Sequence, residues 1–405
     1  MKKNIFIVVA LLVLGTITNA QTTTEVKKEV TSPAKKWFEA ISLRGYMQVR
    51  YNKLLETNSD LGCEQCDKSW GGDNSFFVRR GRLVFSGNVH DRVYIYIQPD
   101  FASSASTTSN NFLQIRDMYA DISLDAKKEF RFRVGQSKVP YGFENIQSSQ
   151  NRLTLDRNDA LNSAVANERD LGVMFYWAPK NKRELFSKLV NDGLKGSGDY
   201  GVVGLGIYNG QTANRAEANN NQHVVGRVSY PFEFKNGQIL EAGIQGYTGK
   251  YVVQSISTAK SVITKPNGEY LDQRAAASVV LYPKPFGFQA EYNIGTGPEY
   301  NTANNTIEQK KLHGGYMQAF YNLKVDQHVI LPFVKYQMYR GGKKQELDAR
   351  SYSVNDLEIG VEWQPFKNIE LVADYTISDR RYEDAVKPIN VQTGNLLRLQ
   401  LQINF

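Results

Sequence analysis

Arginines recur on the polar face of segments in which apolar and polar residues alternate. Residues 41–52, 129–138 and 395–405 each alternate in this way, and their polar positions include arginine. The pair Arg79-Arg80 leaves the parity of its own segment ambiguous. A guanidinium stays charged when confined and binds phosphate or carboxylate through two parallel hydrogen bonds, so these arginines predict a surface for anions. The arginines expected on one inner face are Arg44, Arg50, Arg80, Arg82, Arg131, Arg133 and Arg398.

Acidic residues occupy the same polar face in later segments. Rings of charge set the ion preference of a channel, and two walls of opposite sign would create a transverse field that orients dipolar solutes. The alternative reading is that these charges solvate a wide interior and pair with one another. The acids expected to form the opposed wall are Glu241, Glu291, Glu358, Glu362, Glu370 and Asp374.

Motifs for catalysis and metal binding are missing. The four histidines, His90, His223, His313 and His328, do not form a ligand spacing such as HExxH, and the chain has no GxSxG elbow and no P-loop. A Ser, a His and an acid could still converge in space, so a barrel enzyme stays a minor alternative. We expect no enzyme activity, no cofactor and no metal site.

The amino terminus predicts export. Lys2 and Lys3 precede a short apolar run and a small-residue site ending at Ala20, so residues 1–20 read as a signal peptide, followed by a polar periplasmic segment at 21–40. An uncleaved anchor is the alternative, although the apolar run is shorter than the roughly 20 residues of a spanning helix. In an oxidising compartment Cys63 and Cys66 are expected to form a disulfide in a loop.

Alternation continues from residue 41 to the last residue, in segments near the 9–11 residues that cross a membrane as a tilted strand. A soluble sandwich also alternates, but its strands are usually shorter. The sequence therefore predicts an all-β fold, a closed antiparallel transmembrane barrel of about 16 strands over 41–405. The expected strands are 41–52, 75–89, 92–101, 112–125, 129–138, 169–178, 199–209, 222–235, 238–252, 271–282, 286–296, 311–323, 328–340, 352–365, 368–379 and 394–405.

The connections alternate between short and long, as expected for periplasmic turns and external loops. Residues 179–198 break this rhythm, because a short turn is expected there. The longest connection, 139–168, is the third external loop, and its own apolar residues predict that it packs inside the barrel and narrows it. The charged residues expected at this constriction are Lys138, Glu144, Arg152, Asp156, Arg157 and Asp159.

Three segments resemble the phosphate-selective porin O/P family. They are Phe77-Val-Arg-Arg80-Gly-Arg82-Leu, Arg116-Asp117-Met-Tyr119-Ala-Asp121, and Phe132-Arg133-Val-Gly135-Gln136-Ser-Lys138-Val-Pro140-Tyr-Gly142-Phe-Glu144. The last is similar to the family's GQxKxPFGxE segment, Glu168-Arg169-Asp170-Leu-Gly172 follows at a similar interval, and the chain ends on an aromatic residue, Phe405.

The resemblance implies a trimeric barrel of the outer membrane of a Gram-negative bacterium, with a pore-narrowing third loop. It also implies an arginine ladder and a lysine cluster on that loop that select phosphate or polyphosphate. Between Lys138 and Arg169 this loop carries instead two arginines and four acids. Family resemblance therefore indicates the fold more directly than the solute.

Three functions remain open from the sequence. The first is a diffusion porin for small anionic or polar solutes, including phosphate or polyphosphate. The second is a channel for an oligosaccharide or another polar nutrient, and the third is a surface receptor or adhesin that uses long external loops such as 53–74. The net charge of +8 favours anionic solutes and lipopolysaccharide phosphates over nucleic acid as partners. A homotrimer in contact with outer-membrane lipid is expected.

Overall fold

Strands form wherever the sequence alternates, because a β-strand turns successive side chains to opposite faces. The computed structural model describes residues 37–55, 61, 74–102, 112–258 and 260–405. The predicted signal peptide, residues 21–36 of the predicted polar segment, and Cys63 and Cys66 lie outside the described residues. The end of that polar segment, Trp37–Ala40, forms the 3₁₀ helix η1 directly before the first strand.

The strands follow the predicted order. They are β1 (Ile41–Leu54), β2 (Ser75–His90), β3 (Val93–Asp100), β4 (Gln114–Ser123), β5 (Phe130–Lys138), β6 (Arg169–Trp177), β7 (Val203–Tyr208), β8 (His223–Glu233), β9 (Ile239–Val252), β10 (Glu269–Leu281), β11 (Phe286–Asn301), β12 (Thr306–Tyr321), β13 (Leu323–Val325), β14 (His328–Gly342), β15 (Ser351–Phe366), β16 (Ile369–Glu383) and β17 (Val391–Asn404).

The sheet closes on itself. Apart from β12 and β13, each strand pairs antiparallel with its neighbours in the chain, and β1 also pairs with β17, with Tyr46 opposite Asn404. Strands β12 and β13 both pair with β14 and are separated only by Asn322, so they form one wall strand. The fold is therefore the predicted closed antiparallel barrel with 16 wall strands.

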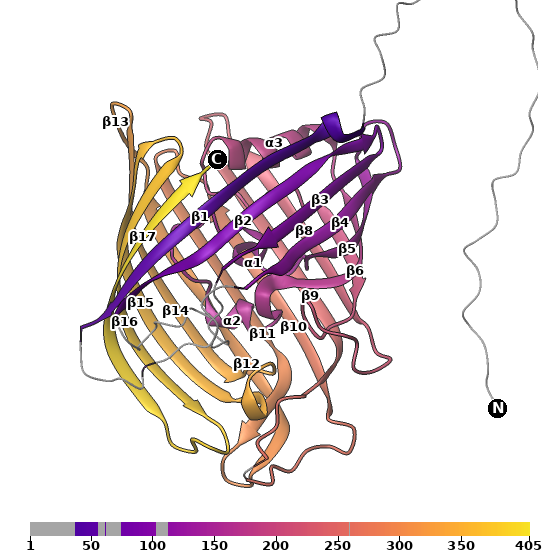
Figure 1. Cartoon of the computed structure of the whole chain (residues 1–405), viewed down its shortest axis with the longest axis vertical. Coiled ribbons are helices and arrows are strands. Elements are labelled where there is room, and N and C mark those ends of the chain that lie inside the picture. The colour runs from indigo at the N-terminus through magenta and orange to yellow at the C-terminus, as the bar shows by residue number, and fades with distance from the viewer. Residues whose placement is uncertain (1–36, 56–60, 62–73, 103–111, 259) are drawn as a thin grey trace, which may run out of the picture. The chain divides into compact units, whose positions relative to one another are not determined.

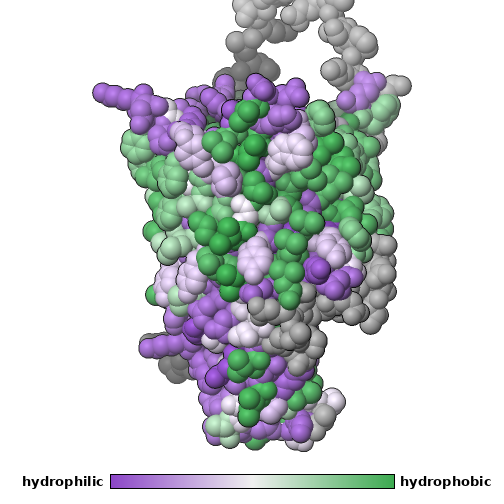
Figure 2. All heavy atoms as spheres, turned by 90° about the vertical axis from the view of Figure 1, so that its left-hand side faces the viewer, coloured by the Kyte–Doolittle hydropathy of each residue, from purple (hydrophilic) through white to green (hydrophobic). Residues whose placement is uncertain are grey.

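Alternation separates an apolar outer face from a polar inner face. On β17, Leu399 is 42% exposed while its neighbour Arg398 is fully buried. On the face shown in Figure 2, hydrophobic side chains gather in a band, with hydrophilic side chains above and below it. Such a belt of exposed apolar residues is the surface that a barrel presents to lipid. None of the helices in the described part of the chain has the length and hydrophobicity of a membrane-crossing helix.

The two ends of the barrel differ. Helix η1, helix α3 (Lys180–Asn191) and the carboxyl terminus lie at the end where the connections are short, which is the periplasmic end (Figure 1). The irregular connection 179–198 contains α3 and adds no strand, so the strand count is unaffected. Residues 199–202, expected in a strand, precede β7 instead, because Gly201 adopts a positive φ of 75° and turns the chain there.

The external end extends further than predicted. Strand β11 continues to Asn301 and β16 to Glu383, although these strands were expected to end at residues 296 and 379. Paired backbone groups can continue a sheet into water, where alternation of side chains is no longer required, and this explains why the pattern missed these extensions.

The wall is uneven in height. Strands β3 to β7 have 8, 10, 9, 9 and 6 residues. On the opposite side β11, β12 and β15 have 16 each. The barrel thus has one low side and one tall side.

Candidate functional site

The loop 139–168 lies inside the barrel, where Figure 1 shows its helices α1 (Phe143–Ile146) and α2 (Asp159–Asn162) within the ring of strands. The loop leaves the wall at β5 and makes contact on the far side at β11. There the Glu291 carboxylate accepts hydrogen bonds from the backbone N–H groups of Phe143 (2.5 Å) and Glu144 (2.8 Å). This bridge satisfies donors that a helix start leaves open.

Asp156 joins the loop to arginines of the barrel wall. Its carboxylate lies 2.7 Å from the Arg398 guanidinium, 3.1 Å from that of Arg50 and 3.6 Å from that of Arg79. Burial acts to raise the pKa of Asp156, but Arg50, Arg398 and Arg79 hold this pKa well below its usual range. One loop carboxylate is thus shared by three arginines of β1, β2 and β17.

A β-bulge resolves the ambiguous pair Arg79-Arg80. The register between β1 and β2 shifts at Gln48/Val49, where Gln48 faces Arg80 and Val49 faces Val78. Arg79 is the extra residue of this bulge, and it reaches Asp156 inside the barrel. Both arginines therefore direct their side chains into the barrel, which strict alternation would not allow.

Other contacts hold the loop to the tall side. The Lys335 ammonium of β14 lies 2.6 Å from the Glu144 carboxylate, and Arg380 of β16 lies 3.0 Å from Asp159. Lys343 also pairs with Asp159 at 2.5 Å. Burial acts to raise the pKa of Glu144, but Lys335, Arg152 and the Asn158 N–H lower it below its ordinary value.

Lys138 and Arg157 fold the loop onto itself. The Lys138 ammonium donates to the carbonyl oxygens of Ile146 (2.9 Å) and Gln147 (2.8 Å). The Arg157 guanidinium donates to the Glu168 carboxylate at 2.7 Å and to the Glu144 carbonyl oxygen at 3.0 Å. These two predicted constriction residues brace the loop from within.

The remaining predicted arginines have varied surroundings. Arg82 donates to Asp100 and to the Tyr46 hydroxyl, each at 2.7 Å. Arg133 donates twice to Asp121, and Arg131 lies 2.8 Å from Asp199. Arg44 is exposed near the periplasmic mouth, with its guanidinium 5.8 Å from the Tyr96 ring centre.

Two buried arginines have no carboxylate within ion-pair distance among the described residues. Arg80 is 4% exposed and donates to the Gln48 side chain at 2.7 Å. Arg152 is 6% exposed and donates to the Leu155 carbonyl oxygen at 3.1 Å, which also accepts from Arg50. The Nε atom of each lacks a hydrogen-bond acceptor. Uncompensated buried cations attract an anion.

The predicted acids are engaged with partners. Glu241 accepts from Arg227 (3.1 Å), and Glu362 accepts from Lys195 (2.6 Å). Glu358 and Asp374 both accept from Arg398, at 2.9 and 3.2 Å. Together with Glu291 on the loop, these contacts favour the reading in which the acids pair rather than form an open wall.

Glu370, the last of these acids, accepts hydrogen bonds from the side-chain amides of Gln402 (2.7 Å) and Asn404 (2.9 Å) on β17. It lies at the periplasmic end, beside Glu362 in the adjoining strand.

Several interior residues were not predicted. Lys335 and Arg380 stand on the polar face of their strands, so the same alternation could have identified them. Lys195 lies in an irregular segment after α3, where the sequence has no period. Nothing in the local sequence indicates its contact with Glu362.

Comparison with known proteins gives the same fold. The chain aligns with Salmonella typhi OmpF in complex with daunomycin at 13% identity and a TM-score of 0.56, covering 90% of this chain and 97% of that one. An anion-selective porin from Comamonas acidovorans aligns at 10% identity and 0.51, covering 90% and 99%. The trimer form of Vibrio cholerae OmpT aligns at 10% and 0.52, again covering 90% and 99%.

No curated protein sequence matches the chain. The family model "Phosphate-selective porin O and P" matches residues 56–405, which is most of the chain and includes the loop 139–168 and all the predicted inner-face arginines except Arg44 and Arg50. This chain therefore belongs to the phosphate-selective porin O and P family and is an outer-membrane porin of a Gram-negative bacterium.

Proposed function

We propose that this porin passes small anionic or polar solutes by passive diffusion, and that phosphate-like anions rest beside Arg80 and Arg152. The observation that carries the proposal is that both guanidinium groups are buried without a carboxylate partner in the described part of the chain. A phosphate oxygen could accept from their open N–H groups.

The surrounding charge supports a preference rather than strict selection. Asp156 offsets part of the charge of Arg50, Arg79 and Arg398, and Arg82 is offset by Asp100. Arg80 and Arg152 add two further positive charges to this side of the interior. The loop also lacks a lysine cluster, so phosphate would be held weakly and released quickly, as conduction requires.

The test is single-channel recording in planar bilayers under a KCl gradient, with phosphate titrated in. Wild type is expected to show an anion-biased reversal potential and a phosphate block of the chloride current. The double variant Arg80→Gln/Arg152→Gln is expected to weaken the block about tenfold, the effect of losing roughly 1.4 kcal/mol.

The matched control is Arg215→Gln, the same chemical change in an exposed loop. It should leave block and reversal potential unchanged. Equal block in the double variant and wild type would refute the anion site. A current that phosphate does not affect but maltodextrins block would instead support an oligosaccharide channel, and absence of conductance would support a receptor or adhesin.

We also propose that the porin is a homotrimer that contacts outer-membrane lipid and lipopolysaccharide. Support comes from the low side of the wall and from the trimer form of the Vibrio cholerae OmpT neighbour. Unheated gel electrophoresis in mild detergent, combined with light scattering, tests the oligomeric state.

A further inference from the structure

We infer that residues 192–202, here called the strap, form a second constriction that is built from the periplasmic side, with Lys195 as the residue that anchors it to the far wall. The strap connects α3 to β7. Its role is separate from the anion site at Arg80 and Arg152, and it does not depend on that site.

The position of Lys195 carries the argument. Its ammonium lies 2.6 Å from the Glu362 carboxylate of β15, and the two side chains are 4% and 0% exposed. Counted around the ring from β6, with β12 and β13 as one wall strand, β15 is the eighth strand in either direction. The segment that leaves the wall at β6 thus reaches the wall directly opposite.

The strap is enclosed where it crosses. Leu194, Lys195, Gly196 and Ser197 are all buried. Burial alone would lower the pKa of Lys195, but Glu362 and Glu370 together raise it above its ordinary value. The lysine therefore keeps its charge inside the barrel.

The strap also contacts the constriction loop. The Gln147 side-chain amide donates to the Lys195 carbonyl oxygen at 2.7 Å. Leu194 belongs to a buried apolar cluster that includes Phe143 of α1 and Tyr282 of the wall. Loop and strap are therefore stacked along the barrel axis, and a solute that passes the loop next meets the strap.

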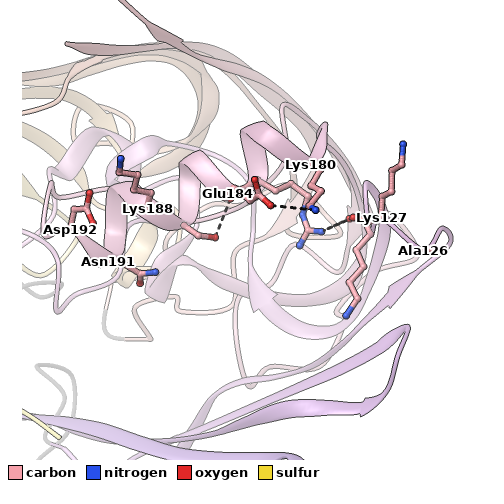
Figure 3. A pocket seen from close by; sticks show the side chains of 10 residues that line it. Ala126, Lys127, Lys180, Glu184, Lys188, Asn191 and Asp192 are labelled. Atoms are coloured by element: carbon pink, nitrogen blue, oxygen red, sulfur yellow. Dashed lines mark hydrogen bonds and ion pairs between the residues drawn. The ribbon is translucent and has the colours of Figure 1, made fainter. Parts of the chain in front are cut away.

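Helix α3 secures the strap at the rim. Its apolar side chains Leu185, Phe186 and Leu189 are buried. Its polar side faces a pocket shared with the turn at 126–128. Figure 3 shows this pocket lined by Lys127 of the turn and by Lys180 and other residues of the helix. An amphipathic helix of this kind lies flat on the wall it covers.

The returning half of the strap is held on the opposite side. Asp199 accepts from Arg183 of α3 at 2.9 Å and lies 2.8 Å from Arg131 of β5. At Gly201 a Cβ atom would lie 2.7 Å from the Val203 carbonyl oxygen, so only glycine fits this turn. The strap is fixed at both walls and at the loop. It therefore divides the periplasmic part of the lumen into two passages, one of which is lined by arginines.

The test places a reactive thiol in the strap. In a Cys63→Ser/Cys66→Ser background, Lys195→Cys is treated with a charged methanethiosulfonate while single-channel KCl conductance is recorded. We expect conductance to fall by about a third or more, because bulk is added at a narrow point of the pore. Lys188→Cys is the matched control; it lies on the exposed side of α3 and should react without changing conductance.

Complete modification of Lys195→Cys, verified by mass spectrometry, without a change in conductance would overturn the inference. A second variant covers the case in which that protein does not assemble. Glu362→Gln removes the charge that anchors Lys195 and keeps the side-chain shape; it should raise conductance or open-channel noise. Unchanged conductance and noise in Glu362→Gln would likewise count against the strap. Phosphate block, which reports on Arg80 and Arg152, should persist in both variants.

Discussion

At the scale of single residues, Asp156 controls how much positive charge the interior offers. It faces Arg50, Arg79 and Arg398, all within 4 Å. Asp156→Asn leaves the three guanidinium groups without this offset, so we predict a stronger anion preference. The reversal potential under a KCl gradient measures it. Asp326→Asn, in an exposed turn, is the control, and an unchanged reversal potential in Asp156→Asn would contradict the assignment.

Alternation identified Arg50 and Arg398 from the sequence, because an inward position is a property of one strand. The bulge at Arg79 depends on the partner strand, and the sharing of Asp156 depends on how a distant loop folds. The contact between Lys195 and Glu362, at a sequence separation of 167, also depends on how a distant irregular segment folds. Residue faces could be predicted, whereas partners that meet across the lumen could not.

At the scale of elements, the buried pair of Lys335 and Glu144 fastens the constriction loop to β14. Lys335→Met would leave Glu144 buried without its cation, a change that costs about 3–5 kcal/mol when a buried pair is broken. We predict faster trypsin cleavage at Arg152 and Arg157 in the folded barrel. Lys324→Met, at an exposed position of β13, should behave as wild type.

The same pair gives a pH dependence. The pKa of Glu144 is lowered in the folded loop. The pairing of this carboxylate with Lys335 therefore stabilises the folded loop fully at pH values above the ordinary pKa of 4.5, and this stabilisation is lost as the pH falls below that value. Open-channel noise should therefore rise on acidification below this value. In Lys335→Met the carboxylate has lost its cation, so noise should be high already at neutral pH and respond less to acid.

Gly135 tests the junction of β4 and β5. Its φ is 125°, and a Cβ atom there would lie 2.3 Å from the Met118 carbonyl oxygen. We predict that Gly135→Val prevents assembly, seen as loss of the heat-modifiable band on gels. Gly226→Ala is the control, because its Cβ would meet only the Leu205 side chain at 3.5 Å. Folded Gly135→Val barrels would show that this backbone can relax.

Strands were the most predictable elements, because apolar side chains must face the lipid and polar side chains the lumen, so that the two kinds alternate along each strand. Helix α3 was the exception: its segment was recognised only as too long for a turn. A short amphipathic helix on a barrel rim has a weak pattern, and its apolar side is defined by the wall it covers rather than by its own sequence.

At the scale of the whole molecule, the low side of the wall is where the subunits of the proposed trimer would meet. β3 and β7 have 8 and 6 residues, fewer than the 9–11 needed to span the bilayer. A neighbouring barrel would shield what these strands leave uncovered. We predict that Leu171→Asn on β6 dissociates the trimer, whereas Ile359→Asn on tall β15 does not, although the two residues are 51% and 49% exposed. Equal dissociation would place the interface elsewhere.

The loop and the strap flank a single strand, β6, so one continuous stretch, 139–202, supplies both obstructions of the lumen. Their anchors come late in the chain: Glu144 bonds Lys335 across 191 positions, and Asp156 bonds Arg398 across 242. Contacts of such high sequence separation form slowly, because the intervening chain must be ordered first. The loop is therefore expected to be fixed in the interior late in folding, after the strands that supply Lys335 and Arg398 are in place.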